Sequence, residues 1–112
     1  MNNSGKKWEE QGSKFLENQG FKIIDKNFTC RMGEIDIIAV KDEVIHFIEV
    51  KFRKKGSISN AAESVTVSKQ KRIKSAAGFF LIKNQKYMDF YQQFDVFAID
   101  GDRFEYIENC FY

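Results

Sequence analysis

The 112-residue sequence is poor in cysteine and contains no long apolar run. Cys30 and Cys110 are too few for a metal cluster, and we expect both to be free thiols in a reducing cytoplasm. The first ten residues, MNNSGKKWEE, have no apolar core for export, and no apolar stretch approaches the length of a membrane span. These absences predict a cytoplasmic protein without a membrane partner.

Proline is missing altogether and histidine occurs once, whereas phenylalanine occurs twelve times. The formal net charge is only +2, so a nucleic-acid partner would have to be met by a local basic patch. Hydrophobic residues make up 43% of the chain and charged residues 30%, which is ordinary for a soluble globular protein. We expect residues 1–7 to be a disordered polar tail and residues 8–112 to form one domain.

The segment 33–53, GEIDIIAVKDEVIHFIEVKFR, carries charged residues inside two apolar runs of strand length. The polar pair Lys41-Asp42 lies between the runs and predicts a hairpin. A two-residue loop at this pair would bring Val40 opposite Glu43. This hairpin is the stretch around which the rest of the chain is expected to be organised.

Side chains two apart along a strand share a face, so this hairpin places Glu34, Asp36, Glu49 and Lys51 together. Carboxylates crowded on a half-buried face repel one another, and a divalent cation such as Mg²⁺ or Mn²⁺ would relieve the repulsion. The alternative is a salt-bridge network on a solvated face, against which the flanking isoleucines argue. His46 falls on the opposite face, where a structural role is expected.

The remaining periodicities predict an α/β fold with a mixed sheet of about five strands flanked by helices, in the order α-β-β-β-α-β-β. The elements are a helix over 8–19, a strand over 21–30 with irregular residues 25–27, a helix from Thr66 or Ser68 to about Asn84, and strands over 94–99 and 103–108 joined by a turn at Asp100-Gly101. The buried stripe of the second helix is expected to consist of Ile73, Ala76, Ala77, Phe80 and Leu81.

Two basic stretches could supply contacts to a phosphate backbone. They consist of Arg53, Lys54 and Lys55 after the second hairpin strand, and of Lys69, Lys71, Arg72 and Lys74 at the start of the second helix. Lysine and arginine in such positions give sequence-independent affinity for nucleic acid. The plainer reading, a solvated loop and a soluble helix surface, remains open.

The spacing of Asp36 and Glu49-Val50-Lys51 resembles the signature of PD-(D/E)XK nucleases, with Ile35 where the proline of that signature would stand. A wider string looks like the YraN family, which is similar in fold to archaeal Holliday-junction resolvases. It comprises Gly20-Phe21, Gly33-Glu34-Ile35-Asp36, Glu49-Val50-Lys51 and Ile107-Glu108-Asn109. The resemblance covers roughly residues 8–111 and implies a restriction-endonuclease-like fold.

The resemblance implies a Mg²⁺-dependent (or Mn²⁺-dependent) endonuclease that acts on DNA, in particular branched or structured DNA. Asp36 and Glu49 would hold the cation, and Lys51 would position or activate water or hold the scissile phosphate. Resolvase-like enzymes also place a metal-site glutamate on the first helix, and Glu9, six residues before Phe15, occupies the matching position. Without the resemblance, the sequence favours reading Glu9 as a solvated acid in the first turn of a helix.

Glu34 and Gln70 are expected to support the metal-binding residues from a step further away. Two other functions remain open: a nucleic-acid-binding module that keeps the fold but does not cleave, and a protein-interaction subunit. With His46 as its only histidine, the chain offers no histidine-based nucleolytic mechanism.

Phe79 and Ile82 fall outside the buried stripe of the second helix and predict a second contact. A homodimer would cover them and would suit the paired strands of a junction, a point that rests on the resemblance to resolvases. The alternative is that the C-terminal hairpin folds back over both residues within one chain.

Overall fold

The computed structural model describes residues 4–53, 65–101 and 103–111. Its elements, in order, are α1 (Ser4–Asn18), β1 (Lys22–Cys30), β2 (Gly33–Lys41), β3 (Val44–Arg53), α2 (Val67–Lys83), the short 3₁₀ helix η2 (Gln85–Tyr87), β4 (Tyr91–Asp100) and β5 (Arg103–Phe111). The strands form one sheet in the order β1-β2-β3-β4-β5. Only β3 and β4 run parallel, and α2 lies between them in sequence. The predicted α/β fold with a mixed five-stranded sheet is therefore confirmed.

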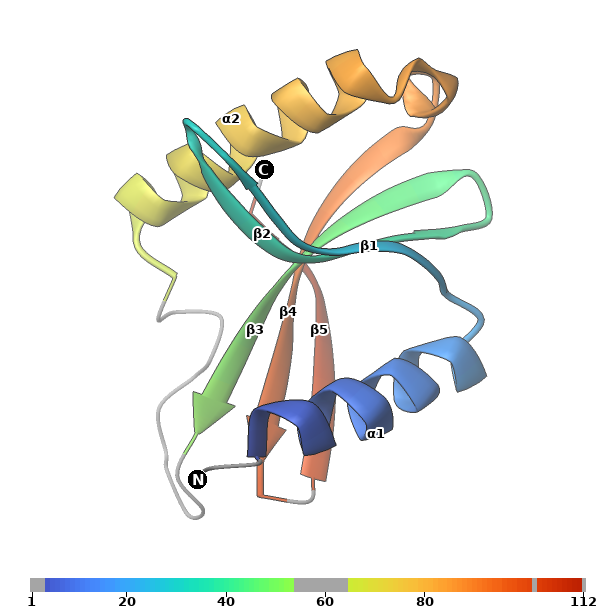
Figure 1. The fold of residues 1–112 in the computed structure, drawn as a ribbon, viewed down its shortest axis with the longest axis vertical. Helices are drawn as coiled ribbons and strands as arrows, with labels where there is room; N and C mark the ends of the chain where they lie inside the picture. Colours follow the sequence, from blue (N-terminus) through green and yellow to red (C-terminus); the bar gives the residue numbers. More distant parts are fainter. Residues whose placement is uncertain (1–3, 54–64, 102, 112) are drawn as a thin grey trace.

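The two long helices lie on opposite sides of the twisted sheet (Figure 1). Helix α2 packs against one face of the sheet through five residues, all buried as the helical periodicity predicts: Ile73, Ala76, Ala77, Phe80 and Leu81. Below α1, Leu16 packs against the other face together with Ile37, Ile48 and Phe97. The central strands are apolar on both faces because each face is covered by a helix.

The hairpin turn lies at Asp42-Glu43 and not at the predicted Lys41-Asp42. Both turn residues have positive φ angles, 51° and 63°, as a type I′ turn requires, and an aspartate tolerates this conformation well. Lys41 stays in β2 and pairs with Val44, while its ammonium lies 5.1 Å from the ring centre of Phe21. The predicted residue pairs between β2 and β3, such as Val40 with Glu43, are therefore wrong. Since the register differs by two residues, each side chain keeps its predicted face.

Helix α2 begins after Thr66, whose side chain accepts a hydrogen bond of 3.1 Å from the Lys69 amide. Of the two predicted caps, Thr66 is thus the one used, and Asn84 caps the other end. Helix α1 begins at Ser4, four residues before the predicted start at Trp8.

The remaining differences lie at strand ends. Strands β4 and β5 extend beyond the predicted 94–99 and 103–108, because polar residues at their ends continue the ladder. Asp100 pairs with Arg103 and therefore belongs to the ladder and not to the turn. The register of β1 shifts between Ile23 and Asp25, just before the predicted irregular residues 25–27, of which Asn27 has a positive φ of 54°. Cys30 and Cys110 are free, as predicted.

No helix in the described parts of the chain is long and apolar enough to cross a membrane.

Candidate functional site

Strands β2 and β3 separate just before the residues that the sequence singles out. Their backbone pairing ends at Ile37 and Ile48, one position short of Asp36 and Glu49. Beyond this point the amide of Val50 donates a 2.8 Å hydrogen bond to Asp36 Oδ2, so a side-chain carboxylate takes the place of a strand carbonyl. The fork therefore holds the Asp36 carboxylate against β3 by a hydrogen bond to the backbone.

Glu49 lies on the α2 side of β3 and is only 7% exposed. Its Oε1 atom is 2.6 Å from Nζ of Lys69, which belongs to the first turn of α2. Lys51 follows two residues after Glu49, on the same face of β3. The Thr66 cap sets where α2 begins, and it therefore also sets the position of Lys69 against β3.

The Asp36 carboxyl has an unusual environment. Burial raises its pKa to about 6, and the nearby charges of Glu49 and Glu34 act in the same direction. The hydrogen bond from Val50 and the charge of Lys69 oppose this rise without cancelling it. At neutral pH the carboxylate is thus ionised but poorly stabilised, which is the condition that a bound cation improves.

The pKa values of Lys51 and Lys69 are shifted in opposite directions by their surroundings. Burial lowers the pKa of Lys51, and the neighbouring Lys69 ammonium lowers that pKa further. Burial also lowers the pKa of Lys69, but the hydrogen bond and charge of Glu49, with smaller contributions from a hydrogen bond with Lys51 and from the charge of Asp36, outweigh burial and leave that pKa raised. Lys69 is therefore the firmly charged lysine of the cluster, and Lys51 is the one that loses its proton more readily.

Asp36 and Glu49 suit a cation that takes its remaining ligands from water and substrate. Among the residues that the structure describes, no group of three or more histidine, cysteine or acidic side chains is arranged to hold a metal ion. Glu9, half-buried on α1, is thus not joined to Asp36 and Glu49 in a three-acid group. Mg²⁺ is commonly held by one or two carboxylates, water and a substrate phosphate, so this pair fits it without a complete protein cage.

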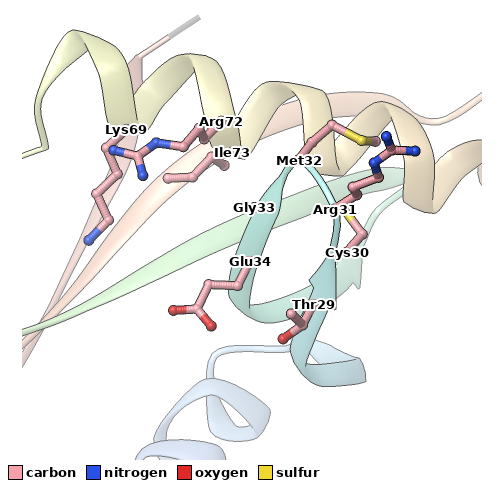
Figure 2. A pocket seen from close by; sticks show the side chains of 9 residues that line it. All are labelled: Thr29, Cys30, Arg31, Met32, Gly33, Glu34, Lys69, Arg72 and Ile73. Carbon is pink, nitrogen blue, oxygen red and sulfur yellow. The ribbon is translucent and has the colours of Figure 1, made fainter.

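A cavity of about 590 Å³ opens beside the cluster, between the β1–β2 turn and the start of α2 (Figure 2). Its lining residues are Thr29, Cys30, Arg31, Met32, Gly33, Glu34, Lys69, Arg72 and Ile73. Gly33 packs closely on α2: a Cβ atom there would lie 3.2 Å from both Cβ and the carbonyl oxygen of Arg72. Three cationic side chains and one carboxylate line the cavity, a charge balance that favours an anionic ligand.

The other predicted residues fall into two groups. Lys71 and Lys74 are exposed on α2, whereas Gln70 donates a 3.0 Å hydrogen bond to the carbonyl of Val65 and so anchors the chain entering the helix. The second group, Lys54, Lys55 and the side chain of Arg53, lies outside the described residues.

A second polar cluster, centred on Asp95, lies on the α1 side of the sheet and is absent from the sequence-based prediction. Asp95 is fully buried and accepts hydrogen bonds from the Tyr106 hydroxyl, the Asn109 amide at 2.9 Å and the Gln93 side chain at 3.0 Å. His46 Nδ1 lies 2.7 Å from the same carboxylate. The available signal was a lone aspartate inside the apolar run FDVFAI.

Burial raises the pKa of Asp95, yet its hydrogen bonds together outweigh burial and hold the pKa below its ordinary value. His46 also packs edge-on against Phe21, with ring centres 4.8 Å apart. These contacts make the cluster a packed structural network and agree with the structural role expected for His46.

Comparison with known proteins gives one consistent result. Residues 8–99 match the model of "Uncharacterised protein family UPF0102". A UPF0102 protein of Clostridium perfringens is 50% identical over 101 residues, covering 87% of this chain and 82% of the relative. Relatives from Saccharophagus degradans and Francisella tularensis are each 40% identical, covering 98% and 96% of this chain and 93% and 92% of their own lengths.

Proposed function

The chain belongs to the UPF0102 family, and we propose that it is a metal-dependent endonuclease that hydrolyses phosphodiester bonds in branched or otherwise structured DNA. One observation carries the proposal: Asp36, Glu49 and Lys51 meet where β2 and β3 separate, next to a cationic cavity. A protein that only binds DNA has no reason to bury negative charge at this place. The restriction-endonuclease-like class of the fold is part of the same proposal.

In the proposed reaction, a bound Mg²⁺ or Mn²⁺ would supply Lewis-acid stabilisation of the charge that develops on the phosphate. Asp36 and Glu49 would hold the cation, and the Val50 amide keeps Asp36 oriented for that task. Lys51, whose pKa is lowered by burial, is suited to position the attacking water and take up its proton. Glu34 acts from the cavity rim through its charge on Asp36.

The DNA backbone would enter along the start of α2. Lys69 and Arg72 line the cavity, while Lys71 and Lys74 are exposed on the same helix. Such cations give affinity for any phosphate backbone, so the shape of the DNA rather than its sequence would decide the preference. The choice of a branched or structured substrate rests on the resemblance to resolvases, with which this sequence-independent binding is consistent.

We also propose a homodimer. Ile82 on α2 is 64% exposed, which leaves an apolar side chain for a second subunit to cover. Phe79 is half-buried, and its ring centre lies 6.4 Å from that of Phe28 on β1, so the hairpin of β1 and β2 covers part of this residue. Sedimentation at micromolar concentration tests the dimer: Ile82→Ser is expected to give a monomer, and a wild-type protein that is already monomeric would contradict it.

The activity is tested by incubating a labelled four-way junction and a linear duplex with the protein and Mg²⁺. Wild type is expected to cleave the junction, and Glu49→Gln to lower the rate by about two to three orders of magnitude. Glu43→Gln makes the same chemical change in the exposed hairpin turn and serves as the matched control. Cleavage by Glu49→Gln at the wild-type rate would refute the proposed site, and junction binding without any cleavage would favour a non-catalytic binding module.

A further inference from the structure

The Glu49–Lys69 ion pair joins a fixed partner to a movable one. Glu49 is 7% exposed and enclosed between the sheet and α2, whereas the Lys69 side chain is 39% exposed. A lysine with this exposure can turn towards solvent by changing rotamers, without moving the core. The pair can therefore open at the lysine end alone.

Lys69 stands between two places that attract its charge. It contacts Glu49 at 2.6 Å, and it also lines the cavity next to the cluster. In Figure 2 its side chain extends from α2 beyond Arg72, towards the side of the cavity where the Glu34 carboxylate lies. The ammonium group is thus paired with Glu49 and hydrogen-bonded to the neighbouring Lys51 in this structure, and a phosphate in the cavity is its alternative partner.

We propose that Lys69 is a tethered cation, which neutralises Glu49 while no divalent cation is bound and transfers to a substrate phosphate when one binds. The inference rests on the proposed function, since it describes how that site is regulated. A divalent cation on Glu49 releases Lys69, and the released ammonium adds a phosphate contact. Because linkage is reciprocal, DNA in the cavity would in turn favour metal binding, so the two ligands bind cooperatively.

Neutralising Glu49 has the same effect on Lys69 as metal binding, so the transfer can be tested without metal. Binding of a fluorescent four-way junction is measured in EDTA for wild type, Glu49→Gln, Lys69→Met and the double variant. Glu49→Gln should tighten binding about tenfold when Lys69 is present, but less than about twofold in the Lys69→Met background. Lys69→Gln repeats the cycle with a polar replacement, and circular dichroism checks that each variant is folded.

Lys71→Met is the matched control, because it removes the same charge from an exposed position on the same helix. In that background Glu49→Gln should keep its full tenfold gain. An equal gain from Glu49→Gln with and without Lys69 would overturn the inference, because the two charges would then act independently. A protein that cleaves DNA but gives such an additive cycle refutes only the tethered cation, whereas failure of every variant to bind the junction refutes the proposed function as well.

Discussion

The two faces of the sheet hold acidic residues in contrasting conditions. On the α1 side, Asp95 is completely buried and receives hydrogen bonds from four different residues. On the α2 side, within the described part of the chain, Asp36 receives one hydrogen bond, from the backbone amide of Val50, and has the like charge of Glu49 beside it. The pKa shifts follow the difference, since the pKa of Asp95 is lowered and that of Asp36 is raised to about 6.

The contrast separates a structural carboxylate from one that is suited to bind a ligand. A buried carboxylate whose acceptor sites are filled stabilises the fold and has little to offer a ligand. A carboxylate whose ionised form is destabilised by burial and by a second carboxylate, and which lies next to an anion-attracting cavity, is stabilised when a cation binds. By this criterion, the proposed function belongs to the α2 side of the sheet, whereas the α1 side contributes to stability.

The largest expected effect is that of Asp95→Asn. The new amide group would direct hydrogen atoms at a site lined by donors, so we expect a loss of about 3–5 kcal/mol in the free energy of unfolding. Urea denaturation measures this loss, with Asp42→Asn in the exposed turn as the control. A loss below about 1 kcal/mol would mean that the Asp95 network is not the structural centre of this face.

Asp36→Asn should change stability in the opposite direction. Since the folded pKa is raised to about 6 from 3.8, the folded protein binds this proton more tightly than the unfolded chain, and wild-type stability falls as pH rises from about 4 to 6. Asparagine can still accept the Val50 hydrogen bond but carries no charge. We therefore expect a gain of up to about 3 kcal/mol at pH 8.

The pH dependence makes that prediction specific. The difference between Asp36→Asn and wild type should shrink as pH falls through 6 and disappear below about pH 4, where the wild-type carboxyl is protonated in both states. Urea denaturation at pH 4, 6 and 8 follows this difference. A variant that is less stable than wild type at pH 8 would show that Asp36 is satisfied, like Asp95.

The smallest effect is expected for Glu49→Gln, although Glu49 is almost as buried as Asp95. Its partner Lys69 can turn to solvent, so no buried charge is left unpaired, and the repulsion on Asp36 is relieved at the same time. The free energy of unfolding should change by no more than about 1 kcal/mol. Since Asp95→Asn is the same chemical change, equal losses for the two variants would abolish the contrast between the faces.

Much of the α2 side could be predicted from the sequence. The two-residue period along β2 and β3 places Asp36 and Glu49 on one face even though the predicted hairpin register is wrong. The helical period likewise gives the buried stripe of α2. These features depend on residues close together in the chain, where simple periodicity decides.

The features that escaped prediction depend on residues distant in sequence. Asp95 meets His46, which lies 49 positions earlier, only because β3 and β4 pair in parallel. The contact of Lys69 with Glu49 likewise depends on how α2 docks on the sheet, so the sequence suggested a phosphate-binding or solvated lysine but not this ion pair. The fork at Asp36 could not be predicted either, because it replaces a regular strand contact by a side-chain hydrogen bond.

The most direct test of the account is anomalous diffraction from crystals soaked in Mn²⁺ at pH 7.5, because it locates the metal and counts its sites in one measurement. The predicted result is Mn²⁺ bound by Asp36 and Glu49, with Nζ of Lys69 withdrawn from its present 2.6 Å contact. Saturating Mn²⁺ that leaves the Glu49–Lys69 pair closed, or that binds at other acidic residues, would contradict the account.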